Sequence, residues 1–176
     1  MGHQQSTVFQ PAPVAVFTVS DTRTEATDTS GALIVELLKK AGHTLVHYQL
    51  IRDGEAVVRE AVSRELERGR SRFIILTGGT GLTARDTTPE AIRPLYTKPI
   101  PGFGELFRYL SYLDIGTATI QSRADAGLCG HAVVFALPGS TNACRLAMEK
   151  IILPQIDNTQ GPCNFRGVLP PLPNGM

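Results

Sequence analysis

The sequence predicts an α/β protein, a three-layer sandwich in which helices cover both faces of a mostly parallel central sheet. Two patterns support this prediction. Short apolar runs of β-forming residues are typical of strands buried on both faces of a sheet. Segments with the apolar spacing of helices lie between these runs. This alternation is the pattern of a parallel sheet, because parallel strands must be joined by crossover connections.

Four strands are predicted from these runs. The segments 14–19, 72–77 and 131–137 are almost continuously apolar, and the segment 44–51 alternates between apolar and polar residues. The segment 117–121 is also predicted to be strand-like, and the glycine-rich stretch after it is predicted to be a loop.

Helices are predicted between the strands. They run between 28 and 42, between 53 and 69, from 87 to 94, through 103–110, and from 140 through 152. Asp53 is the predicted N-cap of the second helix and Gly69 its end. Thr87 and Glu90 form a predicted capping box around Pro89. The charged residues at 64, 65, 67 and 68 are interpreted as a solvated helix face.

The chain is predicted to hold a single domain. Its 176 residues are 42% hydrophobic and 19% charged, which is the composition of a folded protein of one domain. We expect the α/β domain at 13–160, a flexible N-terminal arm at 1–12 and an extended, proline-rich C-terminal tail at 161–176.

Charge and composition exclude several functional classes. Lys and Arg number 17 against 16 Asp and Glu, a net charge of +1, which argues against nucleic acid or a membrane surface as a partner. No apolar stretch approaches the roughly twenty residues of a membrane span, and the first residues lack the pattern of a secretory signal. Cys129, Cys144 and Cys163 lie far apart, which favours neither disulfides nor zinc. We therefore expect a cytoplasmic protein.

Polar residues follow each predicted strand of the parallel sheet. They are Ser20-Asp21, Arg52-Asp53, Gly78-Gly79-Thr80-Gly81 and Pro138-Gly139-Ser140. Open parallel sheets bind ligands beyond the carboxyl ends of their strands, so we expect these four sets to meet at one edge.

The residue types at this edge indicate a phosphate-bearing ligand. Glycines let a phosphate approach backbone N–H groups closely, and Ser140 stands at a helix N-terminus, which favours an anion. Asp21, Asp53 and Asp86 would repel that ligand unless a cation lay between them, which suggests Mg²⁺. Taken singly, each feature has a structural alternative, because Asp53 and Ser140 can be helix caps and Asp86 a turn residue.

Two nucleotide-binding motifs are excluded. The glycine cluster at 78–81 is not GxGxxG, and it follows the third strand rather than the first, which disfavours a dinucleotide-binding dehydrogenase. It also lacks the GK[ST] ending of a P-loop, so any ATP here is held differently.

Several motifs resemble the MogA/MoaB family of molybdenum cofactor biosynthesis. They are TVSD at 18–21, DTSG at 28–31, TGGTGLTARDTTPE at 77–90, PGFGE at 101–105 and LPGS at 137–140. The resemblance covers the chain from about residue 13 to the PCNF of 162–165. The segments 103–111 and 121–123, together with PCNF, are more similar to the MoaB branch than to the MogA branch.

The resemblance implies a nucleotidyltransferase, a molybdopterin adenylyltransferase with ATP as co-substrate and Mg²⁺ as cofactor. The terminal phosphate of molybdopterin would attack the α-phosphorus of ATP, and pyrophosphate would leave. The resemblance also implies assembly as a trimer or hexamer, and other enzymes of the same pathway as possible partners.

The resemblance further assigns roles to individual residues. Asp53 and Asp86 match the family's functional aspartates and are the expected catalytic residues and Mg²⁺ ligands. The residues expected to bind molybdopterin or ATP are Ser20, Asp21, Thr77, Gly78, Gly79, Thr80, Gly81, Ser111, Ser122, Pro138, Gly139 and Ser140.

The attacking group needs no general base, because a phosphomonoester with a second pKa near 6 is largely dianionic at neutral pH. The two aspartates are therefore interpreted as ligands of the metal or its waters. Two alternatives stay open: a pterin-binding protein that delivers the cofactor without transfer, and a CinA-like relative that uses the same fold on other nucleotides.

Overall fold

A six-stranded, mostly parallel sheet forms the centre of the computed structural model, which describes residues 6–173. The strand order is β2-β1-β3-β6-β5-β4. The four parallel strands are β2 (Thr44–Ile51), β1 (Pro13–Val19), β3 (Phe73–Thr77) and β6 (Ala132–Leu137). The antiparallel edge adds β5 (Asp125–Cys129) and the short β4 (Lys98–Pro99). The predicted fold class is confirmed.

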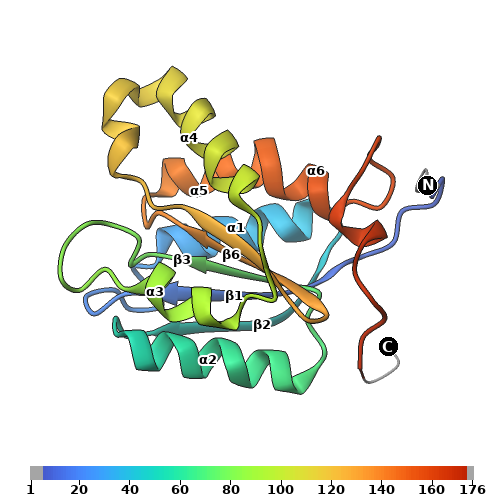
Figure 1. Ribbon diagram of the computed structural model, residues 1–176, viewed down its shortest axis with the longest axis horizontal. Coiled ribbons are helices and arrows are strands. Elements are labelled where there is room, and N and C mark those ends of the chain that lie inside the picture. Colours follow the sequence, from blue (N-terminus) through green and yellow to red (C-terminus); the bar gives the residue numbers. More distant parts are fainter. Residues whose placement is uncertain (1–5, 174–176) are drawn as a thin grey trace.

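Helices cover both faces of the sheet (Figure 1). One face carries α1 (Thr29–Lys40), α4 (Pro101–Ile115), α5 (Thr141–Ala147) and α6 (Leu153–Ile156). A π-helical turn, Met148–Ile152, joins α5 to α6. The opposite face carries α2 (Glu55–Arg68) and α3 (Thr88–Ile92). Single 3₁₀ turns complete the described elements at Arg93–Leu95, Gly116–Gln121 and Phe165–Gly167.

Two apolar cores result from this layering, one on each face of the sheet. Along β1, Val14 and Val16 face the core under α1 and α5, whereas Ala15, Phe17 and Val19 face the core over α2. Because successive side chains of a strand point to opposite faces, both faces must be apolar. The continuous apolar runs of the sequence reflect this requirement. No helix among residues 6–173 is long and apolar enough to cross a membrane.

Local signals placed several helix ends correctly. The side chain of Asp28 caps α1 by accepting a hydrogen bond from the Gly31 N–H, and the side chain of Ser140 caps α5 by accepting one from Ala143. Gly69 ends α2 in the left-handed conformation, with φ of 62°.

One predicted N-cap and the predicted capping box are wrong. The N-cap of α2 is Gly54, at φ of 141°, because the carboxylate of Asp53 is engaged by the backbone N–H of Asp21 instead. Thr87 does occupy the N-cap position of α3, but the capping box does not form among the described residues. The Glu90 carboxylate forms an ion pair with Arg123 instead of accepting a hydrogen bond from the Thr87 backbone N–H.

Three further expectations are corrected. The segment 117–121 forms a 3₁₀ turn, and a strand, β5, forms instead within the stretch predicted to be a loop, between β6 and the edge strand β4. The strand was not predicted because Gly127 is typical of loops. Glycine is required there, because a Cβ would lie 2.3 Å from the ring of Tyr96. Glu65 is buried rather than solvated, and it pairs with Arg68 and accepts a hydrogen bond from Ser71. Burial is possible because these partners compensate the carboxylate.

Among the described residues, the N-terminal segment and the C-terminal tail come together at the amino-terminal edge of the sheet. The Gln10 N–H donates to Asn158 Oδ1 at 2.8 Å, and Leu169 and Leu172 of the tail are buried. The predicted arm at 1–12 and tail at 161–176 lie partly outside the described residues, in 1–5 and 174–176, so the flexible arm and the extended tail both stay predictions.

Candidate functional site

The loops that follow the four parallel strands meet at the carboxyl-terminal edge of the sheet. Figure 1 shows this edge at the ends of β1 and β3, where a long loop precedes α3. The loop after β3 lies against two others: the Gly78 N–H donates to Leu137 O at 3.0 Å, and a Cβ on Gly139 would lie 3.4 Å from the Gly78 Cα. The expectation that distant polar residues converge here is met.

Asp21 and Asp53 form a reciprocal backbone clamp between the loops after β1 and β2. The Asp21 N–H donates to Asp53 Oδ2 at 3.0 Å, and the Asp53 N–H donates to Asp21 Oδ1 at 3.3 Å. The same Asp53 carboxylate borders the loop of residues 78–81, here called the glycine loop. A Cβ on Gly79 would lie 3.4 Å from Asp53 Oδ1. The clamp thereby fixes a carboxylate beside glycine backbone.

Asp86 folds back over the glycine loop from its far end. Its Oδ2 accepts hydrogen bonds from the N–H of Thr83 at 2.9 Å and from the Thr83 hydroxyl at 2.5 Å, and a Cβ on Gly81 would lie 2.8 Å from the same atom. The turn role considered for Asp86 is therefore real. The hydrogen bonds from Thr83 lower the pKa of Asp86, so it stays a carboxylate.

Burial and neighbouring carboxylates disfavour the charge on Asp53. Burial raises the pKa of Asp53, and the negative charges of Asp21 and Asp86 raise it further. Asp53 borders Gly79 and Asp86 borders Gly81, so the two carboxylates lie at the same loop and repel each other. A divalent cation would relieve this repulsion, so these aspartates fit Mg²⁺. Within residues 6–173 no group of three or more His, Cys, Asp or Glu is arranged to hold a metal by itself, so phosphate and water would supply the other ligands.

The glycine loop has a backbone that side chains would disrupt. Gly78 has φ of 106°, and a Cβ there would lie 2.2 Å from Val19 O. Gly79 has φ of 65°, and a Cβ would lie 2.3 Å from Thr88 Oγ1. Thr88 holds the loop by donating from its hydroxyl to Gly78 O and from its N–H to Gly79 O, each at 2.9 Å. The loop is a fixed surface of bare backbone, as anion binding requires.

Several predicted binding residues support the loops through their own hydrogen bonds. Thr77 is fully buried and donates to Pro138 O at 3.1 Å, and Thr80 is also buried. The Ser20 hydroxyl accepts hydrogen bonds from the N–H groups of Thr22 and Arg23, each at 3.2 Å.

Ser111 and Ser140 come together on a cavity of about 340 Å³ between α4 and α5. Ser111 is buried on α4, and Asp114, Thr141 and Asn142 also line the cavity. Ser122 is not among the residues that line it, and the Ser122 hydroxyl accepts a hydrogen bond from the Ala124 N–H at 3.4 Å. The cavity adjoins the N-terminus of α5, next to the Gly139 turn.

Sequence reasoning missed Arg23, which secures the loop after β6. Its guanidinium donates to Gly139 O at 3.0 Å and to Ser30 Oγ at 3.0 Å, and it pairs with Asp28 at 3.2 Å. Asp28 is itself buried, and it also accepts hydrogen bonds from Thr18 and Tyr48. Burial acts to raise the pKa of Asp28, but these hydrogen bonds outweigh it and lower the pKa. The available signal was the DTSG motif at 28–31, which contains Asp28 and Ser30, the two side chains that Arg23 contacts.

Arg123 was also missed, and it clamps the glycine loop from the opposite side. Its guanidinium donates to Gly81 O at 2.9 Å, to Thr80 O at 3.3 Å and to Asp86 O at 2.6 Å, and it pairs with Glu90. Its position in the QSR segment at 121–123 was the available signal, but that it holds a loop about forty positions earlier follows only from the tertiary structure.

Comparison with known proteins agrees with this geometry. Residues 15–158 match a family model described as a probable molybdopterin binding domain. The chain is 45% identical over 162 residues, 92% of its length and 95% of the relative's, to molybdenum cofactor biosynthesis protein B of Escherichia coli K12. It is 50% identical over 142 residues, 80% of its length and 84% of the relative's, to the protein of that name in Bacillus anthracis.

A solved structure supports the same grouping. A crystal structure of a molybdenum cofactor biosynthesis protein B matches with a TM-score of 0.81 and 46% identity, over 84% of this chain and 92% of that one. The chain belongs to the MogA/MoaB family of molybdenum cofactor biosynthesis proteins. Within the family, these relatives are of the MoaB type, and the expected branch is confirmed.

Proposed function

We propose that the protein acts in molybdenum cofactor biosynthesis as a nucleotidyltransferase that adenylylates molybdopterin with ATP in a Mg²⁺-dependent reaction. The observation that carries this proposal is the meeting of Asp53 and Asp86 with a bare glycine loop at one sheet edge. Carboxylates beside an anion-binding backbone fit a polyphosphate bound together with a cation, because the carboxylates bind the cation and the backbone N–H groups bind the phosphates. The names of the relatives support the pathway.

The reaction would form one bond and break one. An oxygen of the molybdopterin phosphate bonds to the α-phosphorus of ATP, the bond from that phosphorus to the bridging oxygen breaks, and pyrophosphate leaves with the electron pair. The backbone N–H groups of Gly79 and Thr80 in the glycine loop, together with the N-terminus of α5, would orient the phosphates, since the Gly78 N–H already donates to Leu137 O. Asp53 and Asp86 would hold Mg²⁺, which supplies charge neutralisation when bound.

Neither aspartate is needed as a proton acceptor. The attacking phosphate is largely dianionic at neutral pH, and the lowered pKa of Asp86 makes that group a poor base. The barrier lies in bringing two polyanions together in line. Lowering this barrier requires positioning and charge neutralisation. The fixed glycine loop would position the phosphates, and the carboxylates would hold the neutralising cation.

The decisive experiment measures pyrophosphate release with molybdopterin and MgATP. We expect release by the wild-type protein, and a loss of at least about a hundredfold in Asp86→Asn, because an amide is a far weaker cation ligand. Molybdopterin affinity, measured separately by fluorescence, should change only a few-fold in the same variant. Normal turnover by Asp86→Asn would remove Asp86 from the mechanism. Tight molybdopterin binding without any pyrophosphate from the wild type would favour the delivery protein instead.

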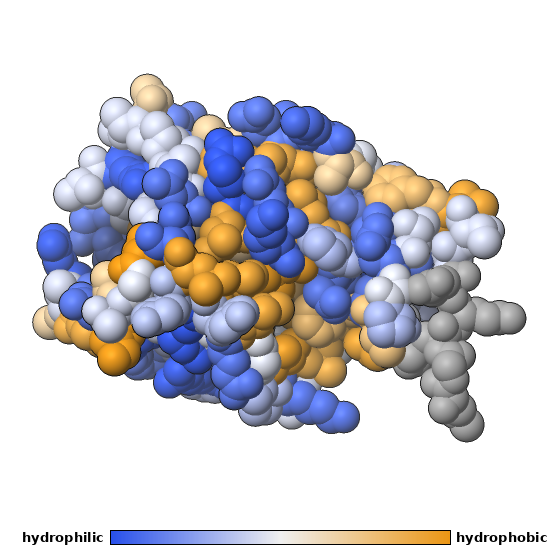
Figure 2. All heavy atoms as spheres, turned by 90° about the horizontal axis from the view of Figure 1, so that it is seen from above, coloured by the Kyte–Doolittle hydropathy of each residue, from blue (hydrophilic) through white to orange (hydrophobic). Residues whose placement is uncertain are grey.

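Self-association belongs to the same proposal. Large apolar side chains stand exposed on α4 and the 3₁₀ turn after it. They are Leu106, Tyr109, Tyr112, Leu113, Ile115 and Ile120. Figure 2 views the molecule from the α4 side and shows apolar residues at the surface among hydrophilic ones. A face of this kind fits a second copy of the chain, and we propose a trimer or hexamer in the cytoplasm.

A further inference from the structure

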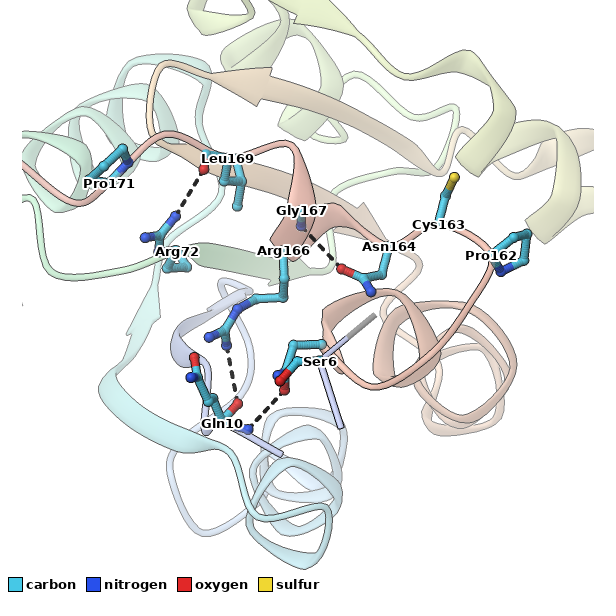
Figure 3. Close-up of a pocket in the computed structure, with 11 residues that line it drawn as sticks. Ser6, Gln10, Arg72, Pro162, Cys163, Asn164, Arg166, Gly167, Leu169 and Pro171 are labelled. Atoms are coloured by element: carbon cyan, nitrogen blue, oxygen red, sulfur yellow. Dashed lines mark hydrogen bonds between the residues drawn. The ribbon is translucent and has the colours of Figure 1, made fainter. Parts of the chain in front are cut away.

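A second cavity lies at the amino-terminal edge of the sheet, at the other end of the strands from the aspartates. It has a volume of about 350 Å³ and is bounded by the N-terminal segment, the start of β3 and the C-terminal tail (Figure 3). Arg72, just before β3, is held in place by its backbone N–H, which donates to Pro13 O at 2.9 Å. Arg166 reaches the same cavity from the tail.

The two guanidinium groups in this cavity have backbone partners but no carboxylate partner within the described chain. Arg72 Nη1 donates to Pro170 O at 2.6 Å and more weakly to Leu169 O at 3.5 Å. Arg166 Nη1 donates to Gln10 O at 3.3 Å. Each group therefore keeps several N–H donors for another acceptor, since a guanidinium has five.

A neighbouring cavity of about 600 Å³ adjoins the first. It shares Gln10, Arg72 and Arg166 with the first cavity and adds Arg70. Arg70 lies 3.5 Å from the Glu65 carboxylate and its Nε is buried without a hydrogen-bond partner among the described residues.

The charges at this edge repel one another. Burial lowers the pKa of Arg72 and of Arg166, and the charge of Arg72 lowers the pKa of Arg166 further, against an opposing effect of Asp157. Burial and the charge of Arg72 also lower the pKa of His131. Partly desolvated positive charges of this kind are stabilised by an anion.

We propose that this cavity binds a compact phosphate group, free or carried by a small molecule, between the guanidinium groups of Arg72 and Arg166. Arginine forks match the geometry of phosphate oxygens, and the Gln10 side chain lines the same wall. This site is separate from the acidic edge and does not depend on the proposed transferase activity.

The test is calorimetric titration of the full chain with inorganic phosphate, pyrophosphate or AMP, in EDTA. EDTA removes divalent cations, so the aspartate edge should not hold these anions. We expect saturable binding of at least one probe, and the three arms distinguish a free anion from a nucleotide phosphate. Arg72→Gln and Arg166→Gln should each weaken that binding about tenfold or more. The matched control is Arg64→Gln, an exposed arginine on α2, which should bind within twofold of wild type.

Two further variants separate a loss of phosphate binding from a loosened tail and from an effect at the aspartate edge. Arg166→Lys keeps the charge and should bind more tightly than Arg166→Gln, even if the tail is loosened in both variants. Asp86→Asn should bind like the wild type. The proposal fails if no probe binds, if both glutamine variants bind like the wild type, if Arg64→Gln weakens binding equally, or if the loss follows Asp86→Asn.

Discussion

At the scale of single residues, the site is governed by carboxylates held near one another. Asp53 accepts the Asp21 N–H, lies beside the glycine loop and feels the charge of Asp86. Its pKa is raised by burial first and by these charges second. Such an arrangement lowers the stability of the folded protein. Functional sites often contain such destabilising charges, because the same charges bind the ligand.

Asp53→Asn should therefore stabilise the protein while reducing its activity. The charged form of Asp53 is penalised only in the folded state, where burial and the neighbouring negative charges raise its pKa. Removing that charge should raise the free energy of unfolding by about 0.5 kcal/mol. The pKa is raised in the folded state, so the gain should shrink as the pH falls through that pKa toward the ordinary value near 4. Urea denaturation at a series of pH values measures this.

The control for this prediction is Glu36→Gln, an exposed carboxylate on α1. It removes the same charge far from the other aspartates, and its effect on stability should be close to zero. A loss of stability in Asp53→Asn at pH 7 would contradict the proposed repulsion among the three carboxylates.

At the scale of elements, the loop between β3 and α3 depends on residues outside it. Arg123, just before β5, donates to the carbonyl oxygens of Thr80, Gly81 and Asp86. Thr88, at the start of α3, holds Gly78 and Gly79. The loop therefore presents its backbone rigidly because two separate elements hold it.

Arg123→Gln should loosen this loop without unfolding the domain. We expect faster amide hydrogen exchange over residues 78–87, pyrophosphate release lower by about tenfold or more, and a loss of unfolding free energy of only about 1–2 kcal/mol. Glu90→Gln is the comparison, because it removes the ion pair with Arg123 but leaves the guanidinium bonds to the loop carbonyls. Unchanged exchange over the loop in Arg123→Gln would show that the clamp is not needed.

At the scale of the whole molecule, the clustered aspartates and the pair Arg72 and Arg166 lie at opposite ends of the parallel strands. The carboxyl-terminal edge gathers Asp21, Asp53 and Asp86, and the amino-terminal edge gathers Arg72 and Arg166. The net charge of +1 does not reveal this arrangement, because a total says nothing of where the charges lie. The apolar face of α4 is a third distinct surface.

The assembly prediction concerns that apolar face. Leu113 is 68% exposed and Ile120 81% exposed, so the double variant Leu113→Glu, Ile120→Glu should fold normally but lose self-association. Light scattering after size exclusion should give a multiple of 19.0 kDa for the wild type and 19.0 kDa for the variant. Val57→Glu, an exposed apolar position on α2, should keep the wild-type mass. A monomeric wild type would refute the proposal.

Much of the fold was predictable because its signals are local. The apolar runs of β1, β3 and β6, the Asp28 and Ser140 caps and the Gly69 end depend on adjacent residues alone. The failures depend on distant partners: Glu65 is buried because Arg68 and Ser71 compensate it, and Glu90 leaves its helix end for Arg123.

The sequence by itself determined the alternation of strands and helices, and with it the edge at which the aspartates and glycines gather, because the carboxyl ends of parallel strands must lie together. Only the tertiary structure decided which groups act on one another there. The repulsion felt by Asp53, the clamps of Arg23 and Arg123 and the arginine pair at the far edge all join residues that are distant along the chain. Coulombic and hydrogen-bond energies depend on separation in space, which the order of residues does not specify.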